Sequence, residues 1–112
     1  MYKNMVEVPE ELEHQINDLA EQVASKMFYR PDQTAKIEFE DVHYDIKMMR
    51  TIMNFKRVIL LVAADRDNGK VIKAVGECDN SFSDYENYKA TVTAFLRDRA
   101  GMDLRPSVTE EE

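Results

Sequence analysis

The chain is short and acidic, with 112 residues, a formal net charge of −7 and 44% hydrophobic residues. This length fits one domain of ordinary size, and the apolar share is sufficient for one hydrophobic core. The chain contains no apolar run of the roughly 18 residues that a membrane span needs, and no secretory signal is visible at its start. The single cysteine, Cys78, cannot form an internal disulfide. We therefore expect a cytoplasmic protein.

The first predicted element is an amphipathic helix over residues 9–29. Pro9 suits the first helical position, because its missing N–H costs no hydrogen bond there. Apolar residues then recur at intervals of three and four, which places them on one helix face: Leu12, Ile16, Leu19, Val23 and Met27. Pro31 ends the helix, because the residue before a proline avoids helical backbone angles.

Residues 35–48 alternate between apolar and polar side chains, which indicates a half-buried β-strand. The apolar residues have odd numbers up to Phe39 and even numbers from Val42 onward, so their parity changes once, at Glu40 and Asp41. This change predicts either a bulge within one long strand or a tight turn between two strands. Residues 46–55 also contain apolar residues at helical spacing, so their state is ambiguous. We expect the strand to end at Met48 and a connection to follow.

The most apolar segment is residues 58–64, which contains no polar side chain. A strand without a polar face is predicted to lie at the centre of a sheet, with both of its faces covered. Asn68 and Gly69 tolerate positive φ angles and predict a turn after this strand. Residues 70–78 then return as the second strand of a β-hairpin.

The last predicted element is a second amphipathic helix that begins after Ser83. Glu86 follows Ser83 by three residues, which is the spacing of a capping box. Gly101 suits the position just beyond the C-terminal end of this helix. The acidic tail, residues 107–112, is predicted to be disordered.

These elements predict a single α/β domain over residues 1–106, of the α+β class and in the order α-β-β-β-α. We expect an antiparallel sheet of three to four strands with both helices packed on one face. This order resembles that of double-stranded-RNA-binding domains. However, those domains carry lysines where this chain reads "SDYENYK", with Asp84 and Glu86. Direct binding of nucleic acid is therefore not expected.

The stretch "EDVHYD" offers the one arrangement with catalytic or metal-binding character. Strand alternation would place Asp41, His43 and Asp45 on one face of the sheet, where two carboxylates and an imidazole could hold a divalent cation. A half-buried sheet produces such polar rows without any function, and His14 is the only other histidine. A metal-dependent enzyme is therefore the last-ranked hypothesis, and no cofactor is expected. The chain also lacks a phosphate-binding glycine loop and a nucleophile motif.

The preferred hypothesis is a non-enzymatic protein-interaction module that binds and regulates or inhibits a protein partner through charge-complementary surfaces. Small acidic chains without motifs are common among phage and mobile-element inhibitors, so we expect an inhibitor of this kind. Acidic residues on the first helix would suit a basic partner, such as a nucleic-acid-binding protein: Glu10, Glu13, Asp18 and Glu21. A basic, methionine-rich segment would suit a partner or a second copy of the chain: Lys47, Met49, Arg50, Met53 and Arg57.

The alternative hypothesis is an oligomeric protein that binds a small ligand, such as a nucleotide or another anion. Tyr44, Arg50 and Arg57 are its candidate residues, because arginine and tyrosine recognise anions well. The sequence leaves the partner, the ligand and the oligomeric state open. It also leaves open which face of the sheet is buried, because the parity change at residues 40–41 makes that assignment reversible.

Overall fold

A computed structural model describes residues 9–30 and 32–101 of the chain. Its elements, in chain order, are α1 (Glu10–Tyr29), β1 (Ala35–Phe39), β2 (Val42–Met53), β3 (Lys56–Asp65), β4 (Val71–Glu77) and α2 (Asp84–Arg99). The α+β class is confirmed, with four strands in the sheet. The predicted disordered tail lies outside the described residues. None of the described helices is long and apolar enough to cross a membrane.

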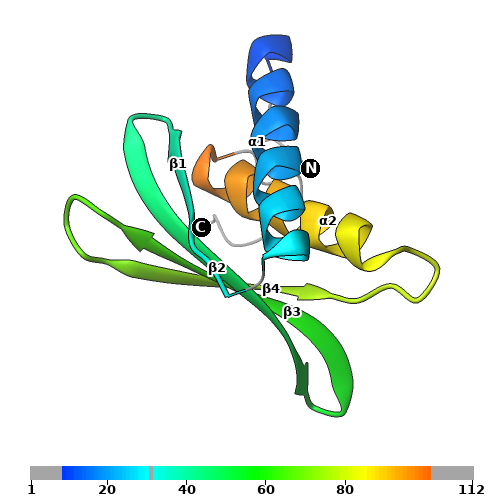
Figure 1. Ribbon diagram of the computed structural model, residues 1–112. Coiled ribbons are helices and arrows are strands. Elements are labelled where there is room, and N and C mark those ends of the chain that lie inside the picture. The colour runs from blue at the N-terminus through cyan, green and yellow to red at the C-terminus, as the bar shows by residue number, and fades with distance from the viewer. Residues whose placement is uncertain (1–8, 31, 102–112) are drawn as a thin grey trace, which may run out of the picture.

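The sheet is a meander in which each strand is antiparallel to the next, in the order β1-β2-β3-β4. Both helices lie on the same side of this sheet (Figure 1), as the sequence predicts. The core fills the space between the helices and the sheet. Its largest fully buried side chains are Phe39, Ile16, Met27, Ile46, Ile59, Leu61, Leu96, Val23 and Val92.

Local signals set the ends of both helices. α1 starts at Glu10, so Pro9 is the N-cap residue rather than the first helical residue that the sequence predicted. At the start of α2, the Ser83 hydroxyl accepts a hydrogen bond from the Glu86 backbone N–H, and the Glu86 carboxylate accepts one from the Ser83 N–H. The predicted capping box is therefore confirmed. Gly101 follows α2 with a φ of +74°, which agrees with the predicted role of this glycine.

The parity change at residues 40–41 is a turn rather than a bulge. Glu40 and Asp41 have φ angles of +52° and +64°, and the residues on either side of them, Phe39 and Val42, are paired across β1 and β2. A two-residue connection with two positive φ angles is typical of a type I′ hairpin turn. The chain therefore forms two strands here, and Tyr44 and Ile46 face the helices.

The prediction that the strand ends at Met48 is wrong. β2 continues to Met53 because each of its residues from Tyr44 onward has a partner on β3, as far as the pair of Met53 with Lys56. The helical preference of methionine is only a few tenths of a kcal/mol per residue, on the order of a single weak contact. A continuous ladder with β3 outweighs it.

The prediction that both faces of β3 are covered is also wrong for the described residues. Ile59, Leu61 and Ala63 are buried beneath the helices. Leu60 and Val62 point to the opposite side, where neither helix lies, and they are half-buried, while Val58 on that side is buried. The uninterrupted apolar run on β3 therefore places apolar side chains on an uncovered surface.

α2 lies unusually close to β4. A Cβ atom on Gly76 would lie 2.0 Å from the hydroxyl oxygen of Thr91. The buried side chain of Asn87, near the start of α2, holds in place the loop that connects β4 to this helix. It accepts a hydrogen bond from the Asp79 N–H at 3.0 Å and donates one to the Asp79 carbonyl at 3.1 Å.

Candidate functional site

The hairpin formed by β2 and β3 extends beyond both helices (Figure 1). We call residues 49–57 the projecting hairpin. Met48 is the last residue of β2 that is buried against the core, and the following residue on the same face, Arg50, is exposed. Apolar side chains are exposed on both faces of this segment and at its tip: Met49, Ile52, Met53 and Phe55. The projecting hairpin therefore lacks the apolar covering that the rest of the sheet has on its helix side.

Phe55 lies at the tip of the projecting hairpin and is fully exposed, with a relative accessibility of 102%. Asn54 and Phe55 form the two-residue turn, with φ angles of +51° and +66°. Glycine is the residue preferred at the second position of such a turn, because any Cβ atom is strained there. Phe55 thus combines a strained backbone with a large apolar side chain in water. Neither property stabilises the isolated domain.

The projecting hairpin is also basic. No acidic residue occurs between Asp45 and Asp65. Two of its arginines are held by residues that follow β4. The Arg50 guanidinium donates to the Asp84 carboxylate at 2.6 Å, and the Arg57 guanidinium donates to the Asn80 side-chain oxygen, also at 2.6 Å. These contacts fix the base of the hairpin against the start of α2 without burying its apolar tip.

A further apolar surface continues from the projecting hairpin onto the sheet face that neither helix covers. We call this the uncovered face. Its central row contains Met49, Leu60 and Val75 on three adjacent strands. The next row contains Lys47, Val62 and Lys73. The apolar row therefore has two lysines on one side, whereas the row on its other side contains Thr51, Val58 and Glu77.

The acidic residues predicted on the first helix do not form one free surface. Glu13 accepts a hydrogen bond from Arg97 at 3.3 Å, and Glu21 accepts one from Lys89 at 3.2 Å. Both bonds join α1 to α2. Glu10 lies 3.8 Å from the imidazole of His14. Half of the predicted acidic stripe therefore serves the contact between the helices.

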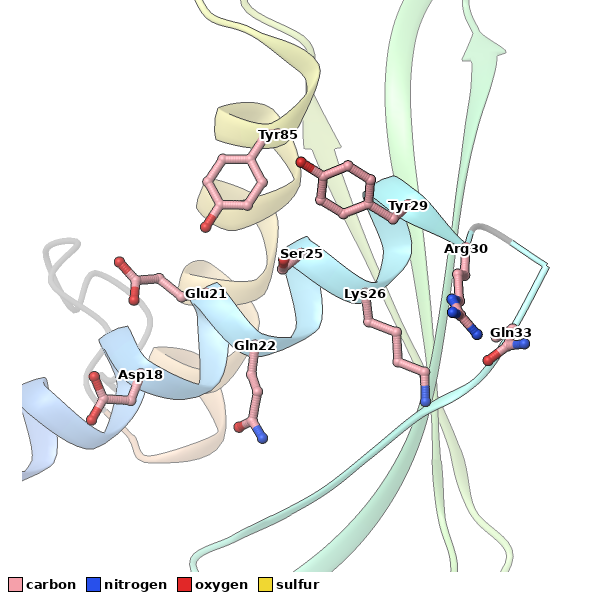
Figure 2. A pocket seen from close by; sticks show the side chains of 9 residues that line it. All are labelled: Asp18, Glu21, Gln22, Ser25, Lys26, Tyr29, Arg30, Gln33 and Tyr85. Atoms are coloured by element: carbon pink, nitrogen blue, oxygen red, sulfur yellow. The ribbon is translucent and has the colours of Figure 1, made fainter.

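A shallow hollow of about 830 Å³ lies along α1, near the start of α2. Asp18, Glu21, Lys26, Tyr29 and Tyr85 are among the residues that line it. Figure 2 shows Tyr85 on α2 and the other four on α1, with side chains that point in different directions rather than towards one point. This hollow has no set of convergent polar groups that would orient a small ligand.

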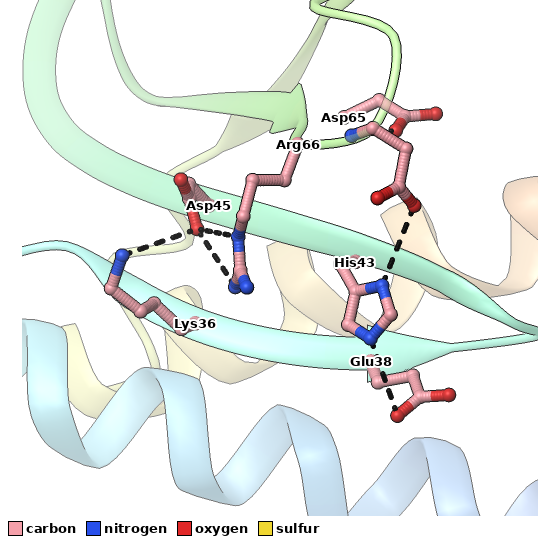
Figure 3. Close-up of polar contacts among 7 residues, drawn as sticks. Lys36, Glu38, His43, Asp45, Asp65 and Arg66 are labelled. Carbon is pink, nitrogen blue, oxygen red and sulfur yellow. Dashed lines mark hydrogen bonds and ion pairs between the residues drawn. The ribbon is translucent and has the colours of Figure 1, made fainter.

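The polar residues of "EDVHYD" separate into two sets of contacts (Figure 3). The Asp45 carboxylate pairs with Arg66 at 3.2 Å and with Lys36 at 3.7 Å. The His43 imidazole lies 3.6 Å from the Glu38 carboxylate and 3.4 Å from that of Asp67. Asp41 belongs to the turn before β2.

This arrangement does not bring the three predicted residues together around one point. Among residues 9–30 and 32–101, no group of three histidine, cysteine or acidic side chains is placed to hold a metal ion. Exposed ion pairs of this kind contribute little to stability and are common on a solvated sheet face. The contacts of Figure 3 therefore need no catalytic explanation.

The residues of the ligand hypothesis are also separated. Tyr44 is buried in the core, where its ring packs edge-on against Phe95 with the ring centres 5.5 Å apart. Arg50 lies six residues further along β2, which corresponds to about 20 Å of extended strand. Arg50 and Arg57 do share a hollow of about 520 Å³, but the two guanidinium groups already bind Asp84 and Asn80. Within one copy of the chain, the three residues therefore do not line one pocket.

Met49 and Met53 were predicted as partner-binding residues from the sequence, whereas Phe55, in the same segment, was not. The signal was present in the sequence, since "NF" occupies the two turn positions where "NG" is typical. It was not recognisable as a turn while β2 was expected to end at Met48. Comparisons with protein-family models, with curated proteins and with solved structures give no significant match.

Proposed function

We propose that this protein is a non-enzymatic interaction module that binds a protein partner with its projecting hairpin and thereby regulates or inhibits that partner. The observation that supports this proposal most directly is Phe55, an aromatic side chain that is fully exposed on a backbone with a φ of +66°. Strained residues persist where function requires them. Exposed aromatic residues that become buried in a complex often supply much of its binding energy.

The neighbours of Phe55 support the same reading. Ile52 and Met53 are exposed beside it, and methionine and aromatic residues are enriched in protein interfaces. Full burial of a side chain such as phenylalanine or methionine is worth roughly 1.5–3 kcal/mol. The hairpin could therefore anchor a complex although it offers few residues. A narrow two-stranded ribbon also has the shape to enter a cleft, and occupation of a cleft would inhibit the partner.

The charges of the hairpin indicate the chemistry of that partner. Lys56 lies next to the tip of the hairpin, Arg50 and Arg57 lie nearer its base, and the hairpin contains no acid. Basic groups at the margin of an interface increase the rate of association with an acidic surface. We therefore infer a partner with an apolar cleft and an acidic rim. Glu13 and Glu21 of α1 are paired with α2, as Arg50 of the hairpin is with Asp84. The hairpin is the stronger candidate surface because of its exposed apolar tip.

Affinity capture with matched variants tests this proposal. The Phe55→Gly variant removes the aromatic ring and places the preferred residue in the turn. Captured proteins are quantified by mass spectrometry for the wild type and for this variant. We expect a stoichiometric partner that the wild type retains and the variant loses, at equal protein concentration and moderate salt.

Two control variants separate loss of contact from other effects. Asp41→Gly makes the same kind of backbone change in the other two-residue turn, and Tyr29→Ser removes another exposed aromatic ring, on α1. Both should retain the partner. If Phe55→Gly binds the same partner with unchanged affinity, the hairpin is not the binding surface. If all three variants lose binding equally, the effect is not specific to Phe55.

A further inference from the structure

β4 forms an edge of the sheet, and within the described residues it pairs only with β3. At one end of this ladder the Asp65 N–H donates to the Lys70 carbonyl, and at the other end the Cys78 N–H donates to the Arg57 carbonyl. Backbone groups alternate in direction along a strand. The even-numbered residues of β4 therefore bond to β3. The odd-numbered residues, Val71, Lys73, Val75 and Glu77, direct their N–H and C=O groups outward.

We propose that a second copy of this chain pairs with this edge, antiparallel and with the two-fold axis at Val75, so that two four-stranded sheets form one sheet of eight strands. This pairing is independent of the function proposed for the hairpin, because it involves a different part of the molecule.

Charge favours this register over the one with its axis at Lys73. With the axis at Val75, Lys73 of each copy lies opposite Glu77 of the other, and the pair occurs twice by symmetry. With the axis at Lys73, the two lysines would face each other, which is unfavourable. A lysine in the middle of an edge strand opposes pairing with arbitrary strands. Here the same residue would favour one partner in one register.

The helix side of the edge has room for this arrangement. A groove of about 240 Å³ runs between β4 and α2, and the exposed residues Ala90 and Ala94 contribute to its wall. In the proposed register, Ala74 of one copy lies opposite Gly76 of the other, so only small side chains meet beneath the helices. The close contact of Gly76 with Thr91 holds β4 in position against α2.

On the opposite side of the sheet, the proposed pairing makes the apolar row of one copy continuous with that of the other. Met49, Leu60 and Val75 form one row on the uncovered face. An axis at Val75 places the corresponding row of the second copy directly in line with it. The exposed side chain of Val75 then lies between Leu60 of its own chain and Val75 of the second copy, which partly removes it from water. Pairing thus joins two narrow apolar surfaces into one.

Sedimentation of the full chain over a range of concentrations tests the proposal. We expect a monomer–dimer equilibrium that Lys73→Glu and Glu77→Lys each weaken by about tenfold. The double variant, Lys73→Glu with Glu77→Lys, should restore it because the opposite charges again face each other. The melting temperature of each variant shows that the monomer still folds. A chain that remains monomeric at all concentrations, or a dimer that ignores these charges, overturns the proposal.

A cysteine at the axis tests the register. In a Cys78→Ser background, the Val75→Cys variant should form a disulfide-linked dimer on mild oxidation. Residues of a hydrogen-bonded antiparallel pair have Cα atoms about 5.5 Å apart, within the range that a disulfide requires. The matched variant Val71→Cys places the two thiols about 27 Å apart and should not cross-link. Equal cross-linking of both variants contradicts the register.

The Phe55→Gly variant distinguishes this inference from the proposed function. It should dimerise as the wild type does, because Phe55 lies at the tip of the projecting hairpin and β4 does not reach it. Loss of the dimer in Phe55→Gly would show that the copies associate through the hairpin instead, and would overturn the pairing proposed here.

Discussion

Replacement of Phe55 by glycine should stabilise the folded domain, although it deletes a large apolar side chain. A residue other than glycine at a left-handed backbone angle costs about 1–2 kcal/mol. Glycine removes this cost but loses more backbone entropy on folding, which reduces the gain in stability by about 0.5–1 kcal/mol. The ring of Phe55 is fully exposed, so its removal sacrifices no burial. The net expectation is a gain of about 0.5–1 kcal/mol in the free energy of unfolding.

Thermal denaturation followed by circular dichroism measures this gain. For a domain of this size, 1 kcal/mol corresponds to a change in melting temperature of about 4 °C, so Phe55→Gly should raise it by roughly 2–4 °C. Wild type and variant are compared at one protein concentration, because association would shift the melting temperature. Urea titration gives the same difference in free energy independently.

The Phe55→Ala variant identifies the source of the gain. Alanine also lacks the ring but keeps the Cβ atom that is strained at a φ of +66°. We therefore expect its melting temperature to remain near that of the wild type. The reasoning is refuted if Phe55→Gly melts at or below the wild-type temperature. It is also refuted if Phe55→Ala is stabilised as much, because the ring rather than the backbone would then be the cause.

Three further substitutions test the contacts around α2. Asn87→Ala removes two hydrogen bonds to the Asp79 backbone and should cost about 2 kcal/mol; an unchanged urea midpoint would contradict this role. Gly76→Ala should cost about 1–3 kcal/mol, because its Cβ atom meets Thr91, and less in a Thr91→Ala background; strictly additive losses in a double-mutant cycle would count against the contact. The Asp79 carboxylate accepts hydrogen bonds from the Ser81 side chain and backbone, which hold the pKa of Asp79 below its ordinary value of 3.8. This carboxylate therefore stabilises the fold above that value, and its contribution is lost as the pH falls through the lowered pKa. Asp79→Asn should reduce the dependence of the melting temperature on pH below about 4, and an unaltered profile would show that the contribution is absent.

The helices and the strand pairs that depend on local signals were predictable from the sequence. The capping box of Ser83 and Glu86 acts within one helical turn, and the apolar spacing of α1 reflects its own 3.6-residue period. The parity change at residues 40–41 identified the place of the first hairpin turn, although not its form. A bulge and a turn both shift the alternation by one residue, and only pairing distinguishes them.

The candidate site was predictable only in part. Met49 and Met53 were selected by composition, and both are exposed on the projecting hairpin. Tyr44 was grouped with Arg50 and Arg57 by chemistry alone, and the fold places it in the core instead. Phe55 was missed because its exposure depends on how far β2 and β3 extend past the helices. Local sequence contains no measure of that length.

What the sequence determined by itself is the two helices with their apolar faces and the approximate positions of the strands, because these follow from periods of 3.6 and two residues along the chain. Only the tertiary structure decided which sheet face the helices cover. The run of residues 58–64 is apolar on both sides, so it carries no information on which side is buried. That choice is made by the packing of α1 and α2 on the sheet, such as the contact of Tyr44 on β2 with the distant Phe95 on α2. The same contacts leave the uncovered face, the projecting hairpin and the β4 edge accessible for the interactions proposed above.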